Sequence, residues 1–332
     1  MEKRLLQLLG LALFIVAVWQ VWQPLWRYDL NESVDKDSTE KIVFEITQGE
    51  SAKSIGDRLE DKGLIGNDTS FIRTVKNEDL DGLVRYGSFV LSPSMTLRDI
   101  VTTLTTEGSG EMAITVIEGW TIDHIDAKLT DMSLINSGDF KLCTFNCTFT
   151  YDFLGNDRSL EGFLFPDTYF ITSKNFSSED LINRMLQNFD NRWTDEMDTT
   201  LASSGRTLRE VVTVASMLEK EVKTAGDLPI VSGIIWKRLD SEWALGIDAT
   251  LLYIQDDGEI SAEDLASESE YNTRLNKGLP PTAIGNPGLA TLEASLSPRD
   301  SDYWFYLTDP KTDAVIYATS NEEHEANKAT YL

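Results

Sequence analysis

The stretch TLREVVTVASMLEKEV, residues 207–222, decides most of what the sequence says about the fold. Its apolar residues recur at helical spacing, and Thr207 and Glu210 stand where a capping box would satisfy backbone N–H groups of the first turn. The pattern therefore predicts a helix with one apolar stripe, and Glu219 falls on that stripe. The other members of the stripe are Leu208, Val212, Ala215 and Val222.

A carboxylate on an apolar stripe is costly unless it is paired, protonated or placed at the wall of a cleft. Desolvation favours the protonated form, which a general acid needs near neutral pH, so Glu219 is a candidate proton donor. The alternative is a structural ion pair, or an edge position from which the carboxylate reaches water. Glu221 lies about 200° further around the helix and is expected to point away from the stripe.

Composition limits the classes of function. The chain has 332 residues, 55 acidic and 29 basic side chains, and a formal charge of −26. This length suggests about two to three domains. The acidity argues against a nucleic-acid partner and against a basic face for anionic lipid, because both need clustered Lys and Arg. With two His and two Cys in the whole chain, a zinc site built from several such ligands is nearly excluded.

The N-terminus predicts a membrane anchor. Residues 5–26 contain no charge, and at about 1.5 Å per residue a helix of this length spans a hydrocarbon layer of about 30 Å. The alternative is a cleaved signal peptide, whose apolar region is shorter and ends in small residues. Lys3 and Arg4 favour a cytoplasmic N-terminus. We expect a single-pass protein of the cell membrane, with the anchor in 1–27, a polar tether at 28–41 and the remainder extracytoplasmic.

Two segments of the outer region resemble each other. Residues 44–65 and 114–135 each have the pattern of a strand, a glycine turn, a Ser or Thr helix cap and a helix with spaced apolar residues. Returning strands are expected at 86–93 and 161–170. These elements would form two β-α-α-β units, the second over about 114–186, and chance similarity is the alternative.

Two shorter patterns make local predictions. Cys143 and Cys147 could form a disulfide outside the cytoplasm, and a pair of buried thiols is the equal alternative. Their spacing is not C-x-x-C, which disfavours a redox site. The segments 304–309 and 314–319 predict a terminal β-hairpin.

Loops after the helix at 207–222 carry candidate sugar-binding residues. The segment 245–253 leads into an apolar run, and 267–298 is rich in Gly and Pro, with turn residues alternating with apolar ones. Aromatic and amide side chains on such ordered loops suit a sugar-binding groove, and turn chemistry alone is the alternative. The candidates are Asp248, Thr250, Tyr271, Asn272 and Asn286.

Several short motifs, in their order and spacing, resemble the YceG-like family of membrane-anchored endolytic murein transglycosylases. The motifs are LEG at 160–162, FPDTY at 165–169, ASMLEKE at 215–221, DAT at 248–250, YNT at 271–273, GLPP at 278–281, NPG at 286–288 and EH at 323–324. The resemblance covers nearly the whole chain. Within it, residues 42–110 resemble a LysM-like subdomain.

The resemblance implies an α+β fold with an N-terminal transmembrane helix, LysM-like β-α-α-β subdomains and a catalytic domain at 111–332. The catalytic acid would be the first Glu of the A-S-x-x-E-K-E motif, here Glu219. The implied reaction cleaves the β-1,4 bond between N-acetylmuramic acid and N-acetylglucosamine within a peptidoglycan strand. It leaves a 1,6-anhydro end and needs no metal or nucleotide cofactor. Peptidoglycan polymerases are the implied protein partners, and Glu161 would either orient the groove or cap local structure.

The sequence departs from the family pattern at a few positions. These departures concern the contacts with the sugars and leave the catalytic acid of the motif unchanged. These positions are Lys237, Ala249, Glu270, Arg274 and Glu325. Two other functions remain open. One is a hydrolytic muramidase that uses Glu219 and Asp248 as its two carboxylates. The other is a non-catalytic scaffold of the envelope that binds glycan.

Overall fold

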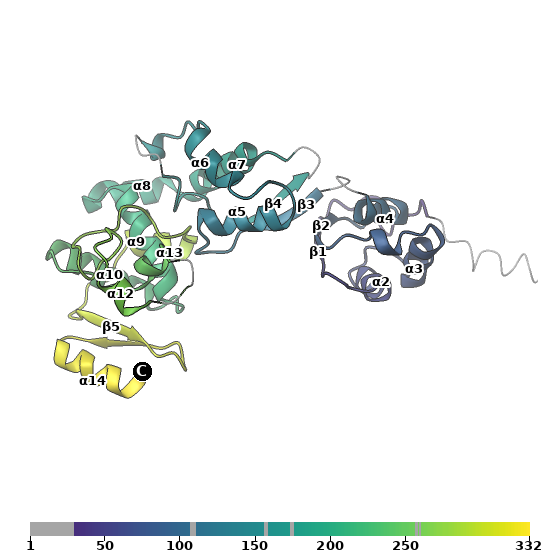
Figure 1. Ribbon diagram of the computed structural model, residues 1–332. Coiled ribbons are helices and arrows are strands. Elements are labelled where there is room, and N and C mark those ends of the chain that lie inside the picture. Colours follow the sequence, from purple (N-terminus) through teal and green to yellow (C-terminus); the bar gives the residue numbers. More distant parts are fainter. Residues whose placement is uncertain (1–29, 107–110, 156–158, 173–175, 256–257, 259) are drawn as a thin grey trace, which may run out of the picture. The chain divides into compact units, whose positions relative to one another are not determined.

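The computed structural model describes residues 30–106, 111–155, 159–172, 176–255, 258 and 260–332 (Figure 1). These residues form two compact units. Unit 1 ends at Ala113 and includes a short return that begins at Phe170, and unit 2 holds Ile114–Tyr169 and the described chain after that return. The predicted anchor at 5–26 lies outside the described residues, and within them no helix is long and apolar enough to cross a bilayer.

Unit 1 is a small α+β unit with its own core. Its elements are β1 (Ile42–Ile46), α2 (Ala52–Asp61), α3 (Asp68–Asn77), the 3-10 turn η1 (Asp81–Leu83), β2 (Gly87–Leu91), α4 (Leu97–Thr105) and the start of β3 (Glu111–Thr115). β1 and β2 are antiparallel, with Phe44 opposite Phe89. Both rings are fully buried, and they pack with apolar side chains of α2, α3 and α4.

An N-cap residue fixes the start of the first helix in each of the two similar segments. Ser51 before α2 and Thr121 before α5 (Ile122–Asp131) each accept a hydrogen bond from a backbone N–H of the first turn, as predicted. With α6 (Asp139–Asn146) and β4 (Thr168–Thr172), the second segment has the same order of elements as the first. The strands follow the order β1-β2-β3-β4 in one sheet.

The predicted returning strand at 161–170 is wrong for most of its length. β4 begins only at Thr168, and the residues before it form a turn in which Gly162 has a φ of +94°. The N–H groups of Gly162 and Leu164 both donate to the side-chain Oδ1 of Asn286, over 3.0 and 2.9 Å. A side chain from a distant loop therefore takes the place of a neighbouring strand as acceptor.

Unit 2 is built around one buried helix. Its remaining elements are η2 (Asp152–Leu154), α7 (Ser178–Arg192), α8 (Asp195–Ser204), α9 (Leu208–Glu221), α10 (Leu228–Asp240), α11 (Ala249–Leu252), α12 (Ala262–Leu265), α13 (Leu289–Leu296), β5 (Phe305–Thr308), β6 (Val315–Ala318) and α14 (Asn321–Tyr331). The predicted helix is α9, and it has the predicted capping box of Thr207 and Glu210. Every residue from Val211 to Leu218 is buried, because α10, α11 and α13 pack around it (Figure 1). The sequence predicted that α9 would bury one stripe of apolar residues, whereas this part of the helix is buried on all sides.

Two local predictions are settled by the structure. β5 and β6 form the expected antiparallel hairpin, in which Leu307 lies opposite Ile316. Cys143 in α6 and Cys147, the residue that ends this helix, are joined by a disulfide. Of the two alternatives left open for these cysteines, the disulfide is therefore the one found.

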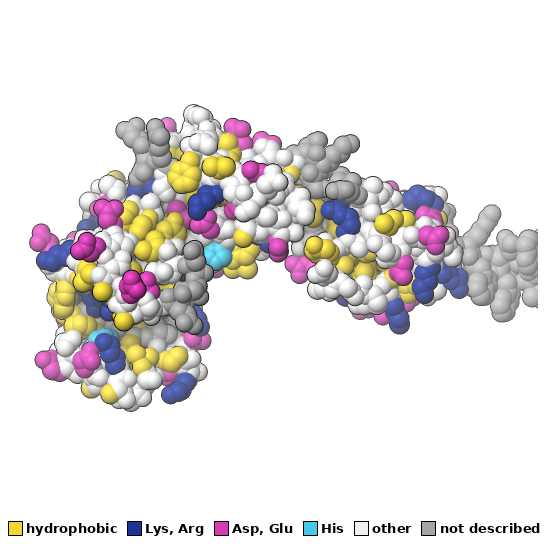
Figure 2. All heavy atoms as spheres, in the orientation of Figure 1, with side chains coloured by type: hydrophobic (Ala, Val, Ile, Leu, Met, Phe, Trp, Pro, Cys, Tyr) yellow, Lys and Arg dark blue, Asp and Glu magenta, His cyan; other side chains and the backbone are white. Residues whose placement is uncertain are grey.

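Charged side chains of both signs are scattered over the face drawn in Figure 2. Acidic and basic side chains are interspersed there over both units. Exposed ion pairs such as Lys223–Asp313, with 2.8 Å between nitrogen and oxygen, follow the same pattern. Such pairs are solvated, so each contributes little to stability.

Candidate active site

The Glu219 side chain is held at the end of α9 by the first turn of α13. The backbone N–H of Gly288 and the hydroxyl of Thr291 donate to its Oε2, over 2.9 and 2.7 Å. Gly288 is the N-cap residue of α13, where N–H groups have no partner within the helix. Among the described residues nothing donates to Oε1 of this half-buried side chain. One oxygen is thus fixed, and the other is available to a substrate.

A tight turn lies against this carboxylate. Gly119 has a φ of +77°, and a Cβ at this position would stand 3.4 Å from Cγ of Glu219. The turn is tied to the loop before α13, because the N–H of Gly119 donates to the carbonyl of Asn286 over 2.7 Å. A Cβ on Gly285 would meet the carbonyl oxygen of Gly119 at 2.6 Å. These two glycines therefore allow the two loops to approach closely beside Glu219.

Asn286, a predicted sugar contact, is fully buried and satisfied within the protein. Its Oδ1 accepts two backbone N–H groups, and its Nδ2 donates to the carbonyl of Trp120 over 2.9 Å and to Glu161 over 3.3 Å. These contacts use the hydrogen-bonding capacity of the amide. The geometry gives Asn286 a structural role, in which it joins three loops of the site.

Glu161 caps α5 from inside the core. Its two oxygens each lie 3.2 Å from the N–H of Ile122, the first residue of α5, and the hydroxyl of Tyr253 donates to it over 3.0 Å. Only 2% of this residue is exposed. Burial raises its pKa to about 7, although the N–H of Ile122 and the Tyr253 hydroxyl favour the charged form. Of the two roles left open for Glu161, the structure supports the cap.

Thr250 and Asn272 are also fully buried. The hydroxyl of Thr250 donates to the carbonyl of Ile247 over 2.7 Å, and Nδ2 of Asn272 donates to the carbonyls of Leu265 and Ser267 over 3.1 and 2.8 Å. Both side chains therefore organise the loops that follow α10. Neither presents a free polar group to a sugar.

Tyr271 and Asp248 are the two predicted contacts that remain partly exposed. The hydroxyl of Tyr271 lies 2.8 Å from that of Thr282, and its ring is 5.3 Å from the ring of Tyr253. Asp248 accepts from Nε of Arg274 over 2.8 Å. The Tyr271 ring is thus partly covered by another aromatic ring, and Asp248 is engaged in an ion pair with Arg274.

Glu221 lies on another side of α9 than Glu219. It leaves the stripe of Glu219, as expected, and its side is partly covered. The N–H of Ala249 donates to its carboxylate. Burial raises the pKa of Glu221 to about 7, and the neighbouring charge of Asp248 adds to the increase. Glu221 and Asp248 are thus two neighbouring, partly exposed acids, so Glu221 is not an isolated surface position.

Glu118 is the neighbour of Glu219 that sequence reasoning missed. Burial and the charge of Glu219 both raise the pKa of Glu118. A Cβ on Gly288 would stand 2.3 Å from Oε1 of Glu118, so the side chain of Glu118 lies directly on this glycine. Comparison of the two similar segments could have drawn attention to Glu118. An acidic residue precedes Gly119 in the second segment, where the uncharged Gln48 precedes Gly49 in the first.

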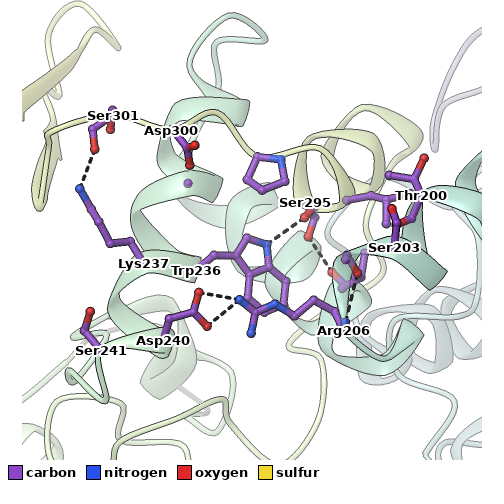
Figure 3. Close-up of a pocket in the computed structure, with 15 residues that line it drawn as sticks. Thr200, Ser203, Arg206, Trp236, Lys237, Asp240, Ser241, Ser295, Asp300 and Ser301 are labelled. Carbon is purple, nitrogen blue, oxygen red and sulfur yellow. Dashed lines mark hydrogen bonds and ion pairs between the residues drawn. The ribbon is translucent and has the colours of Figure 1, made fainter.

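A cavity of about 520 Å³ lies elsewhere in unit 2, and none of the predicted site residues lines it (Figure 3). Both oxygens of Asp240 accept from Nη2 of Arg206, over 2.6 and 2.7 Å, and the guanidinium lies 4.3 Å from the centre of the Trp236 ring. Arg206 and Asp240 are therefore paired with each other, and the Nζ of Lys237 donates to the carbonyl of Ser301 over 2.7 Å. Within the described chain, no group of three or more His, Cys, Asp or Glu side chains is arranged to hold a metal ion.

Comparison with known proteins identifies relatives across most of the chain. The YceG-like family matches residues 44–330. An endolytic murein transglycosylase of Streptococcus pneumoniae is 28% identical over 334 residues, which cover 90% of this chain and 60% of that protein. The protein of the same name from Bacillus subtilis is 28% identical, over 93% of this chain and 89% of its own length. This chain thus spans about 60% of the length of the streptococcal relative.

A solved structure supports the fold. The crystal structure of a yceG-like protein from Listeria monocytogenes superimposes with a TM-score of 0.59 at 29% identity. The match covers 87% of this chain and 100% of the other. The predicted mixed α+β fold, with helices and antiparallel sheets, is therefore confirmed.

Proposed function

Because the chain belongs to the YceG-like family, we propose that it is an endolytic murein transglycosylase with Glu219 as its acid and base. The observation that carries this proposal is the arrangement at Glu219. Its Oε2 is held by Gly288 and Thr291. Its Oε1 accepts no hydrogen bond among the described residues and is left for a proton transfer, and two loops pack closely beside it through Gly119 and Gly285.

The proposed reaction needs one carboxyl group. Protonated Glu219 donates its proton to the glycosidic oxygen as the bond from C1 of the muramic acid to that oxygen breaks. The carboxylate then takes the proton of the C6 hydroxyl, and the C6 oxygen forms a bond to C1. The products are a 1,6-anhydro end and a new 4-hydroxyl end. The proton on Glu219 is restored and no water is consumed.

The remaining predictions from the sequence concern the location of the protein, the role of unit 1 and the partners. We propose that the chain is anchored in the cell membrane through residues 5–26, with the catalytic unit outside and the N-terminus in the cytoplasm. Unit 1, with its β-α-α-β order followed by α4, is proposed to be LysM-like and to position unit 2 along a glycan strand. Peptidoglycan polymerases are the proposed partners, since an endolytic enzyme acts on the strands that they extend.

A hydrolytic muramidase is the nearest rival, with Asp248 as the second carboxylate. The surroundings of Asp248 disfavour it. The carboxylate of Asp248 pairs with Arg274. The charge of Asp248 raises the pKa of Glu221, whereas the charge of Glu219 raises the pKa of Glu118. Asp248 and Glu219 therefore have different acidic neighbours.

Analysis of digested peptidoglycan tests the proposal. The full-length chain, purified in detergent, is incubated with uncrosslinked glycan strands, and the products are identified by mass spectrometry. We expect anhydro ends, because hydrolysis would leave reducing ends one water molecule heavier. Mainly reducing ends would overturn the transglycosylase in favour of the hydrolase.

A pair of variants separates an enzyme from a binding scaffold. Glu219→Gln should lose at least about a hundredfold in rate, which is typical when a general acid is removed. The control is Glu293→Gln, an exposed residue of α13 with no side-chain hydrogen bond among the described residues. If Glu219→Gln matches the unmodified protein, the enzyme proposal fails and the scaffold remains.

A further inference from the structure

The side chains of Glu219 and Lys220 converge on one glycine. Successive residues of a helix are turned by about 100° from each other around its axis, so these two neighbours on α9 are expected to point in different directions. A Cβ at Gly119, however, would stand 3.4 Å from Cγ of Glu219 and 3.4 Å from Nζ of Lys220. Both atoms lie at this distance from one point, so they are at most twice 3.4 Å apart. Lys220 therefore folds back beside the proposed acid.

The ammonium group of Lys220 has no partner of its own. Within the described residues its Nζ makes no hydrogen bond and no ion pair. Burial lowers the pKa of Lys220, against the charges of Glu161 and Glu219, which raise it. Both of these carboxylates already accept hydrogen bonds from other groups. A cation is thus left beside Glu219 without an acid paired to it.

Two neighbouring groups do not compete for this charge or for its ligand. Asp123, in the first turn of α5, is paired with Lys141 over 2.6 Å. His124 is neutral, because its Nδ1 accepts the N–H of Thr121 over 3.3 Å and the ring proton is therefore on Nε2. Burial lowers the pKa of His124, and the charge of Lys220 lowers it further, against the charge of Asp123. Lys220 therefore keeps its charge available to a ligand.

Two aromatic rings lie at the same turn. Trp120 directly follows Gly119, and the centre of its ring is 6.3 Å from that of His124, with 23° between the two planes. Neither residue is buried. Ligand sites combine aromatic surfaces of this kind, which suit the apolar faces of sugars, with a few placed polar groups. Trp120 and Lys220 thus offer both kinds of contact close to Glu219.

We propose that Lys220 is a specificity-determining residue whose ammonium binds the acidic substituent that muramic acid carries on O3. This inference rests on the proposed function of Glu219. A glycan strand alternates two sugars joined by similar β-1,4 bonds, and of the two only muramic acid carries an acid, which is the carboxyl of its lactyl group or of the peptide attached there. The substituent belongs to the same ring as the scissile C1, so a cation beside Glu219 can bind it while that bond lies at the acid. Lys220 thereby selects which of the two alternating bonds is cleaved.

Three preparations of uncrosslinked strands separate the charge from the sugar. The first carries free lactyl carboxylates, the second carries the same groups converted to neutral carboxamides, and the third carries the peptides. A hydrogen bond to a charged group predicts a kcat/KM about ten- to a hundredfold higher for the carboxylate strand than for the carboxamide strand. Whichever acidic strand loses more in a variant without the ammonium carries the natural ligand.

Variants of Lys220 test the charge directly. Lys220→Met keeps the length of the side chain and removes the charge, so it should raise KM for the carboxylate strand with little change in kcat and abolish the preference over the carboxamide strand. Lys220→Arg keeps the charge and should retain most of the preference. The matched control is Lys223→Met, at the exposed lysine that follows α9 and pairs with Asp313 over 2.8 Å. This control should keep the preference.

The closing experiment measures these rates on the full-length proteins, and separately the binding of the carboxylate and carboxamide strands to Glu219→Gln with and without Lys220→Met, by calorimetry. We expect tighter binding of the carboxylate strand, lost with Lys220→Met. If the unmodified protein cleaves both strands with equal kcat/KM, or if Lys220→Met keeps the preference, the inference is overturned and the proposed function stands. If the unmodified protein cleaves no strand, the proposed function is overturned, and equal binding of the two strands to Glu219→Gln would overturn the inference as well.

Discussion

Thr291 donates its hydroxyl proton to Oε2 of Glu219 over 2.7 Å, although 72 positions separate the two residues in the sequence. The contact exists because α13 packs along α9 and its first turn meets the last turn of α9. The same hydroxyl lies 3.0 Å from the carbonyl of Gly288. Thr291 therefore couples the orientation of the proposed acid to the start of α13.

Thr291→Val should impair the chemical step. Valine keeps the volume and the burial but removes one of the two donors that hold Oε2, so the acid is less well oriented. We expect kcat to fall about ten- to a hundredfold with little change in KM. Thr291→Ser keeps the hydroxyl and should stay close to the unmodified rate. An unchanged kcat in the valine variant would mean that the Gly288 N–H alone orients Glu219.

Asn286→Ala should destabilise the protein. It leaves the buried N–H groups of Gly162 and Leu164 without their acceptor, and the free energy of unfolding should fall by about 3 kcal/mol. Urea denaturation measures the loss, and alanine at the exposed Asn191 of α7 should change little. A variant of normal stability with a raised KM would instead support the sugar contact predicted from the sequence.

Glu221→Gln should change how stability depends on pH. The pKa of Glu221 is raised to about 7 in the folded protein from a usual value of 4.5. The folded state therefore binds its proton more tightly than the unfolded state, and this contribution is present below about pH 4.5 and is lost as the pH rises through 7. The glutamine is neutral throughout.

The measurement for this variant is the thermal midpoint between pH 4.5 and 8. The unmodified protein should lose stability across this range more steeply than Glu221→Gln. Glu161, whose pKa is also raised to about 7, contributes in the same direction in both proteins. A steeper loss in the variant would show that the carboxylate of Glu221 is stabilised in its charged form.

Asp248→Asn tests the hydrolytic alternative directly. In a transglycosylase that relies on Glu219, the variant loses its pairing with Arg274 but should still form anhydro ends, at a rate within about tenfold of the unmodified protein. In a hydrolase it would remove one of two essential carboxylates, with a loss like that of Glu219→Gln. Mass spectrometry of the products, together with the initial rate, distinguishes these outcomes.

Buried polar residues mark the limit of prediction from the sequence. Asn272, Asn286 and Thr250 stood out because amide and hydroxyl side chains on loops suit sugars, yet all three are fully buried. A polar residue in a Gly- and Pro-rich loop has the same sequence pattern whether it meets a ligand or the backbone of another loop. Only the fold decides, because the backbone groups that these residues satisfy come from other segments of the chain.

The sequence by itself determined the local elements: the capped helix that carries Glu219, the caps at Ser51 and Thr121, and the terminal hairpin. These depend on periodicity and on contacts between residues a few positions apart, which are visible in a single chain. The tertiary structure alone decided which groups surround Glu219 and that Glu221 is partly covered beside Asp248. Those outcomes depend on how α13, α11 and the turn at Gly119 pack around α9, and close packing joins residues that no local pattern connects.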